Sequence, residues 1–178
     1  MSELPLFKDV AKKEAQHPVY QMIRDGDYEP ERKVLLEWSD GFEDRDGKFC
    51  HEFQTSFEPC LWELYLHAFL KELRATIDFS YSAPDFVVDA EEPFCIEATI
   101  SAPPMDGQPA HGYSMESLPN DFNRFNQDAT IRLCNSFTSK VKRLRERYSK
   151  LAQCENKPFV LARISHEKAV KGRKKRLK

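Results

Sequence analysis

Three acidic residues stand in three different local contexts between positions 61 and 99. Glu63 lies in an apolar run with helical spacing, Asp85 follows a proline before a short apolar run, and Glu97 interrupts the strand-like run FCIEATI. Hard divalent cations take oxygen ligands, and Mg²⁺ is often held by only one or two carboxylates together with waters and phosphate oxygens. A helix carboxylate, a Pro-Asp pair and a strand glutamate in this order therefore predict a metal site that binds Mg²⁺ or Mn²⁺.

Glu97 is the most informative of the three acids. Strand alternation places it on one face with Cys95 and Thr99, and a carboxylate is costly to bury unless it is paired or bound to a metal. Each acid also has a structural alternative. Glu97 pairs with an arginine or faces water, Asp85 closes a turn through its side chain, and Glu63 is a solvated helix residue. The order and spacing of the acids favour the metal site.

The elements that must position these acids follow from the hydrophobic pattern. An apolar helix is predicted over 61–73, with Pro59 in its first turn and Ser56 or Glu58 as its cap. Further along the chain, the pattern predicts strands at 76–79, 86–89 and 94–100, a loop over 101–124, a helix over 128–151 and a central strand at 159–164. The second and third strands are expected to form an antiparallel hairpin, which would bring Asp85 near Glu97. The fold class is therefore α/β, with a mixed β-sheet flanked by helices.

The chain divides into three regions by composition. Residues 1–32 are polar and predict a helical or irregular N-terminal extension with short helices around 7–16 and 18–24. Residues 33–165 are predicted to form the α/β domain, in which a turn at 44–47 is compatible with a hairpin. Residues 166–178 form a basic tail that we expect to be disordered, because 168–178 hold seven of the 27 basic residues and no acid.

Composition excludes several classes of protein. The 178 residues include 40% hydrophobic and 31% charged residues, which is ordinary for a globular domain. No run approaches the roughly 20 apolar residues of a membrane span, and the first residues have no apolar segment typical of a secretory signal, so a cytoplasmic protein without membrane association is expected. The five cysteines are odd in number and form no C-x-x-C pair, which favours reduced, buried thiols over disulfides or a zinc ribbon.

One set of positions resembles the PD-(D/E)XK nuclease superfamily: Glu63, Pro84-Asp85 and Glu97-Ala98-Thr99. The resemblance implies a restriction-endonuclease-like core and Mg²⁺-dependent cleavage of phosphodiester bonds. It also implies that Asp85 and Glu97 bind the metal, that the backbone carbonyl of Ala98 adds a ligand, and that Glu63 assists catalysis. Over 32–164 the chain is also similar to uncharacterised bacterial proteins with WELY, PDF, IEA and SK–KPFVLA blocks.

Thr99 departs from the superfamily pattern, which has a lysine at this position to orient the attacking water and to stabilise charge on the phosphate. Threonine supplies no positive charge. Lys140 is the candidate substitute, because some members of the superfamily supply this lysine from a neighbouring helix. It follows Phe137 by three positions and precedes Leu144 by four, so it borders the apolar face of the predicted helix. The alternative is a solvated basic residue.

Basic residues on the same helix and in the tail predict contacts with nucleic-acid phosphates. They are Lys142, Arg143, Arg147, Lys174, Lys175 and Arg176. DNA is the favoured partner, and a dimer is compatible with the sequence. The alternative is a solvated helix face followed by a disordered end.

Three functions follow, in order of preference. The first is a metal-dependent nuclease in which Lys140 stabilises negative charge and Glu63 or Glu97 accepts a proton from water. The second is a catalytically inactive nucleic-acid-binding or assembly module with the same fold, which Thr99 favours. The third is a small α/β interaction protein whose three acids are coincidental. Glycine-rich phosphate loops and a serine nucleophile elbow are absent from the sequence.

Overall fold

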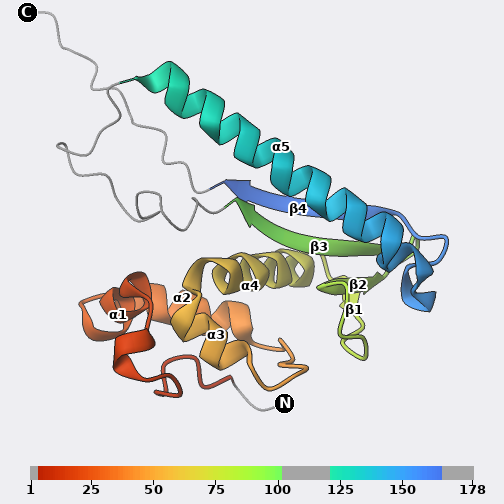
Figure 1. Cartoon of the computed structure of the whole chain (residues 1–178). Helices are drawn as coiled ribbons and strands as arrows, with labels where there is room; N and C mark the ends of the chain where they lie inside the picture. The colour runs from red at the N-terminus through yellow and green to blue at the C-terminus, as the bar shows by residue number, and fades with distance from the viewer. Residues whose placement is uncertain (1–3, 102–120, 166–178) are drawn as a thin grey trace, which may run out of the picture.

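The computed structural model of the chain describes residues 4–101 and 121–165, which form a mixed α/β fold (Figure 1). The strands are β1 (Thr76–Ile77), β2 (Phe86–Asp89), β3 (Phe94–Ser101) and β4 (Phe159–Ser165). The helices are α1 (Pro18–Asp25), α2 (Glu29–Ser39), α3 (Phe49–Thr55), α4 (Phe57–Glu72) and α5 (Phe122–Glu146). Short 3₁₀ turns are η1 (Lys13–Ala15), η3 (Tyr148–Lys150) and η4 (Ala152–Cys154).

The four strands form one mixed sheet in the order β1-β2-β3-β4. β2 and β3 pair antiparallel with Phe86 opposite Ile96, which confirms the predicted hairpin. β3 and β4 run parallel from Cys95 opposite Phe159 onward. Parallel neighbours need a crossover connection, and α5 lies in this connection, above the sheet in Figure 1.

Helices pack on both faces of the sheet (Figure 1). Below it, α4 lies against β3, and the main core joins Leu64 and Leu70 of α4 to Phe86 and Ile96 of the hairpin. The described part of the predicted N-terminal extension belongs to this same core, since Tyr20 is fully buried in it. On the other face, a second apolar cluster joins the sheet to η3 and η4 through Val87, Cys95, Tyr148 and Cys154.

α4 forms much as its sequence predicts. Ser56 occupies the N-cap position, although its side chain makes no capping hydrogen bond, and Pro59 lies in the first turn, where a missing N–H is tolerated. Cys60, Leu64 and His67 recur at helical spacing and are all buried. The chain leaves the helix through Arg74, whose φ is 56°.

The predicted hairpin around residues 44–47 is wrong. This turn joins α2 to α3, because the apolar residues after it repeat at helical rather than alternating spacing, with Phe49 and Phe53 both buried. Both carboxylate oxygens of Asp44 accept the Phe49 N–H at 3.1 Å, so the turn also caps α3. Gly47 adopts a φ of 72°, which favours glycine at the end of this turn.

The prediction that residues 159–164 form a central strand is also wrong. β4 is the last strand of the described sheet, and Val160 and Ile164 keep 44% and 37% of their surface exposed. A continuous apolar run does not distinguish a central strand from an edge strand, because the number of neighbours depends on the rest of the sheet. β4 is tied to the α4 layer by Trp62, whose Nε1 donates to the Ala162 carbonyl at 3.1 Å.

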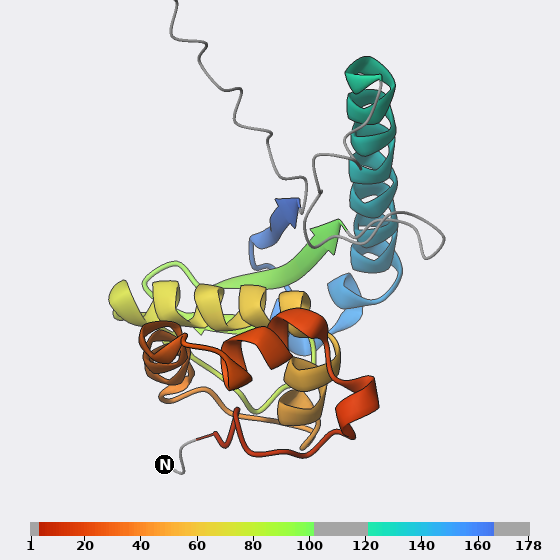
Figure 2. The same cartoon turned by 90° about the vertical axis from the view of Figure 1, so that its left-hand side faces the viewer.

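α5 begins earlier and ends earlier than predicted. Asp121 caps it by accepting the N–H groups of Asn123 and Arg124. Its N-terminal half extends away from the sheet (Figures 1 and 2), so Phe137, which marks the predicted apolar face of this helix, is exposed, as is Leu133. Only the C-terminal half, with Leu144, packs on the second apolar cluster.

Two of the predicted segments fall outside the described residues. These are most of the loop predicted over 101–124 and the basic tail with Lys174, Lys175 and Arg176. Within 4–101 and 121–165, none of the helices combines the length and the apolar character that crossing a bilayer requires. All five cysteines are free thiols, and four of them are buried.

Candidate functional site

The β2–β3 hairpin brings Asp85 next to Glu97. Phe86 pairs with Ile96, and continuing this register by one residue places Asp85 opposite Glu97. Asp85 Oδ2 accepts the backbone N–H of Ala98 at 2.6 Å, which fixes its carboxylate beside the strand. The predicted proximity of these two strand acids therefore follows from one hairpin register, and the Pro-Asp pair stands directly before β2.

Glu97 is buried among positively charged and hydroxyl groups. Only 3% of its surface is exposed. Its Oε1 accepts hydrogen bonds from Lys140 Nζ at 2.5 Å and from the Tyr148 hydroxyl at 3.2 Å, and Arg143 Nη1 lies 3.6 Å away. All three contacts engage the same carboxylate oxygen, and within the described part of the chain Oε2 has no hydrogen bond. The negative charge of Glu97 is thus compensated by groups that all contact Oε1.

Lys140 reaches inward from α5, as its position at the border of the apolar face predicted. It is partly buried and bound to Glu97, whereas Lys142 is exposed and pairs with Glu146 at 3.8 Å one turn further along the helix. Arg143 lies one turn after Lys140 and so shares its side of α5. Two of the basic residues on α5 therefore face Glu97, and Lys142 does not.

Glu63 and Asp85 both line a cavity of about 200 Å³ below the hairpin. Burial, and then the charge of Asp85, raise the pKa of Glu63 to about 8. Burial, and then the charge of Glu97, raise the pKa of Asp85 to about 6, against the lowering effects of the Ala98 N–H and of Lys140. The charge of Asp85 thus acts on Glu63, and the charge of Glu97 acts on Asp85, so each acid lies within electrostatic reach of the next.

Two residues that contact this site, Arg45 and Tyr148, were not predicted from the sequence. Arg45 donates from Nη1 to the carbonyls of Tyr81 at 2.6 Å and Pro84 at 3.2 Å, which holds the segment before Asp85 in place. No local signal marks Arg45, since its partners are about 40 positions away. No local signal marks Tyr148 either, since its hydroxyl reaches Glu97 across 51 positions of the chain.

The hairpin register brings together two of the three predicted acids, Asp85 and Glu97. Within the described ranges, no three His, Cys, Asp or Glu side chains form a group that could hold a metal ion. Binding of a metal ion by Asp85, Glu97 and the Ala98 carbonyl, with Glu63 assisting, therefore stays a prediction. Asp85 and Glu97 each have one oxygen held by the protein and a second oxygen without a described hydrogen bond. Carboxylate oxygens are among the ligands that Mg²⁺ takes together with several waters.

Glu63→Gln is expected to flatten the pH dependence of stability. Because the folded-state pKa of Glu63 is raised from 4.5 to about 8, its contribution is fully present below about pH 4.5 and is lost as the pH rises through about 8. One pKa unit corresponds to about 1.4 kcal/mol, and partial solvent access reduces the effect, so we expect a loss of roughly 1–3 kcal/mol by about pH 9. Urea unfolding at a series of pH values measures it. The control is Glu72→Gln, which changes an exposed glutamate of α4. If the free energy of unfolding depends on pH equally in the two variants, the raised pKa of Glu63 is contradicted.

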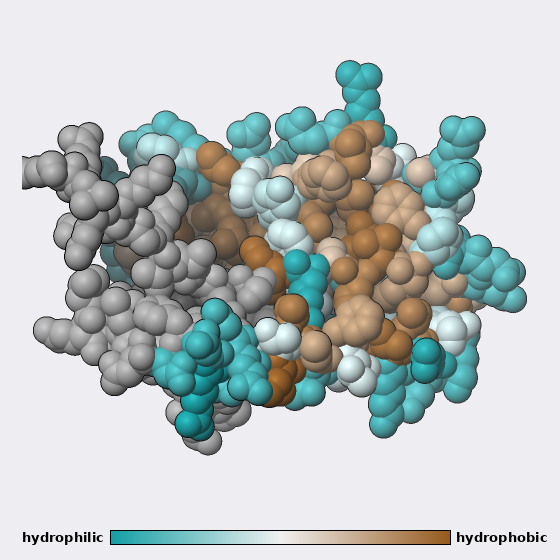
Figure 3. All heavy atoms as spheres, turned by 90° about the horizontal axis from the view of Figure 1, so that it is seen from above, coloured by the Kyte–Doolittle hydropathy of each residue, from teal (hydrophilic) through white to brown (hydrophobic). Residues whose placement is uncertain are grey.

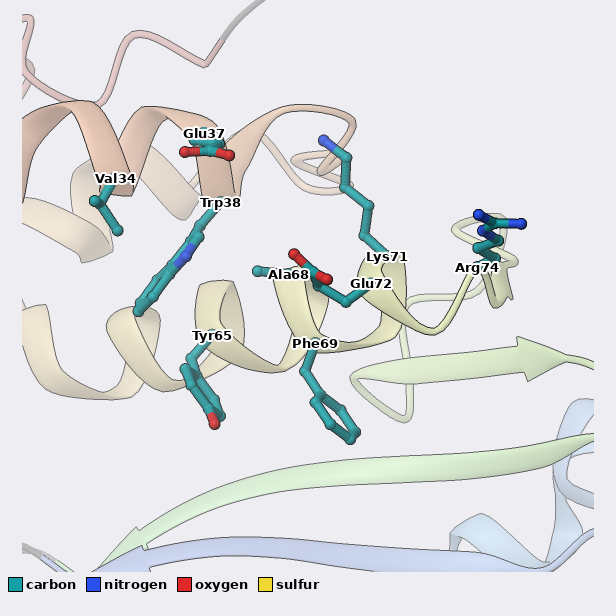
Figure 4. Close-up of a pocket in the computed structure, with 9 residues that line it drawn as sticks. All are labelled: Val34, Glu37, Trp38, Tyr65, Ala68, Phe69, Lys71, Glu72 and Arg74. Atoms are coloured by element: carbon teal, nitrogen blue, oxygen red, sulfur yellow. The ribbon is translucent and has the colours of Figure 1, made fainter.

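A larger groove lies away from these acids, between α2 and α4 (Figure 4). It measures about 640 Å³ and is lined by Val34, Glu37, Trp38, Tyr65, Ala68, Phe69, Lys71, Glu72 and Arg74. None of the predicted site residues lines it. Its Lys71 is already paired with Asp40 at 2.6 Å. The candidate site therefore does not coincide with this larger groove.

The face that carries α5 mixes apolar and hydrophilic side chains (Figure 3). Lys142, Arg143 and Arg147 are exposed near the C-terminal end of the helix, and the exposed apolar residues on α5 include Ile131, Leu133 and Phe137. Of the predicted basic surface, the residues that the structure describes thus lie at the C-terminal end of α5. The tail residues of the same prediction lie outside the described ranges.

Comparisons of the chain with models of known protein families, with curated proteins and with solved structures give no match.

Proposed function

We propose that this chain is a metal-dependent nuclease domain with a restriction-endonuclease-like core that hydrolyses phosphodiester bonds in DNA in the cytoplasm. The observation that carries the proposal is the arrangement around Glu97. Asp85 lies opposite it across the hairpin register, and Lys140 reaches it from α5. Two carboxylates beside a lysine are the groups that such a hydrolysis requires.

Each residue has a distinct role in this proposal. Asp85 and Glu97 would hold Mg²⁺ or Mn²⁺ through the oxygens that the protein leaves without a described hydrogen bond, and the Ala98 carbonyl would add a ligand. The bound ion supplies Lewis-acid activation of water and phosphate. Glu63, with a pKa of about 8, is suited to exchange a proton with the attacking water near neutral pH.

Lys140 takes the role of the lysine that Thr99 replaces. Its ammonium group would stabilise the negative charge that develops on the phosphate. Thr99 is buried with 8% of its surface exposed and lies on the same face of β3 as Glu97. In this proposal, a residue of α5 supplies the positive charge that a lysine at position 99 of β3 would otherwise supply.

Arg143 is expected to contribute to nucleic-acid binding more than Lys142. Arg143 lies on the Glu97 side of α5, and Lys142 pairs with Glu146 on another side. Arg143→Gln should reduce the slope of log K against log salt concentration for DNA binding by about one, since one phosphate contact is lost. Lys142→Gln, which removes the same charge, should change the slope less. Fluorescence anisotropy with a labelled duplex in EDTA measures both, and equal slopes would contradict this placement.

The decisive experiment is DNA cleavage by the intact chain. Plasmid and single-stranded DNA are incubated with the protein in Mg²⁺, Mn²⁺ or EDTA. We expect cleavage in either metal ion and none in EDTA. Salt-sensitive binding without cleavage would instead support the inactive nucleic-acid-binding module, which the Lys140–Glu97 ion pair and Thr99 favour. If the protein neither cleaves nor binds DNA, both proposals are overturned.

A further inference from the structure

The carboxylate of Glu97 is held by three donors that differ in how firmly they are themselves held. Lys140 and Arg143 are flexible, charged side chains, and 22% and 46% of their surfaces are exposed. The Tyr148 ring is buried in the second apolar cluster with Cys95 and Cys154, and it stacks on Phe159 with ring centroids 5.6 Å apart. The Tyr148 hydroxyl is therefore the donor with the most restricted position.

The three donors also differ in what they do when a phosphate arrives. In the proposed function, Lys140 must interact with the phosphate, and Arg143 is attracted to it in the same way. A neutral hydroxyl has no such attraction.

We infer that Tyr148 is a positioning residue of this site: its hydroxyl fixes Glu97 Oε1 and so leaves Oε2 in place for the cation. The inference rests on the proposed function, because it assigns Glu97 to a cation. Tyr148 holds the carboxylate orientation while Lys140 and Arg143 exchange it for substrate phosphate. Groups that orient a ligand carboxylate in this way typically change metal affinity by about 10–100-fold when they are removed.

Tyr148→Phe tests the inference, because it keeps the buried ring and removes only the hydroxyl. Its matched control is Tyr65→Phe, an exposed tyrosine of α4. Titration calorimetry with Mn²⁺ should show affinity weakened by about tenfold in Tyr148→Phe and unchanged in Tyr65→Phe. DNA binding in EDTA should be unchanged in Tyr65→Phe, which loses no phosphate contact.

A second measurement needs no metal. Urea unfolding in EDTA of Tyr148→Phe, Glu97→Ala and the double variant forms a thermodynamic cycle. We expect Tyr148→Phe to lower the unfolding midpoint in the native background and to lower it less in the Glu97→Ala background. Should Glu97→Ala fail to fold, Glu97→Leu takes its place, because it keeps more of the side-chain volume.

The outcomes separate the two claims. If the unmodified protein binds no Mn²⁺, the proposed function fails, and the role of Tyr148 falls with it. If it binds Mn²⁺ and Asp85→Asn abolishes this binding, but Tyr148→Phe binds as tightly as the unmodified protein, only the role of Tyr148 is overturned. Additive effects in the cycle would overturn it as well.

Discussion

Asp85→Asn is expected to lower the rate of DNA cleavage in Mg²⁺ by at least about a thousandfold. The substitution removes the negative charge of one of the two carboxylates proposed to bind the metal, and a bound metal ion supplies several kcal/mol of charge stabilisation in the transition state. Each loss of about 1.36 kcal/mol is a factor of ten in rate. Single-turnover cleavage of plasmid DNA measures the effect.

This variant should lose activity without losing stability. Asparagine keeps the size of the side chain and can still accept the Ala98 N–H that now reaches Asp85 Oδ2. Because the pKa of Asp85 is raised to about 6, ionisation of this group costs folding free energy above that pH. At about pH 8, Asp85→Asn should therefore unfold at a urea concentration equal to or higher than the unmodified protein.

The matched control for this prediction is Asp89→Asn. Asp89 ends β2, is exposed, and undergoes the same change of charge. We expect its cleavage rate to stay within about twofold of the unmodified protein, as is usual for a surface site. If Asp85→Asn and Asp89→Asn cut DNA equally well, Asp85 is not a metal ligand of a catalytic site.

Lys140→Ala is expected to lower the cleavage rate by about 100- to 1000-fold. Lys140 is the cationic group closest to Glu97, at 2.5 Å, and the loss of one fixed donor to a developing anion typically has this effect. Lys142→Ala removes the same charge two positions away and should change the rate only slightly. Single-turnover rates at saturating DNA separate this effect from weaker binding.

A double variant can test whether the lysine acts from the site itself. Thr99→Lys places an ammonium group on the face of β3 that carries Glu97. Combined with Lys140→Ala, it should restore part of the lost rate. Full activity in Lys140→Ala alone would remove the proposed role. Equal losses in Lys140→Ala and Lys142→Ala would show that only the general charge of α5 matters.

The sequence by itself determined the local elements that carry Asp85 and Glu97. Short apolar runs predicted β2 and β3, and their short connection determined that they pair antiparallel. The helical spacing around Leu64 determined α4, and the position of Lys140 four residues before Leu144 placed it on the inward side of α5. Such features depend on neighbours within about one helical turn or one hairpin, so the local hydrophobic pattern is enough to predict them.

The tertiary structure alone decided which groups surround Glu97. Tyr148 reaches it across 51 positions, and Arg45 holds the segment before Asp85 across 39 positions. Whether β4 has one neighbour or two, and how far α5 extends beyond the sheet, also depend on distant packing. Hydrophobic periodicity states which face of an element is buried, but it does not identify the partner that covers that face. The partners of a buried carboxylate are therefore fixed only when the sheet and its crossover helix pack together.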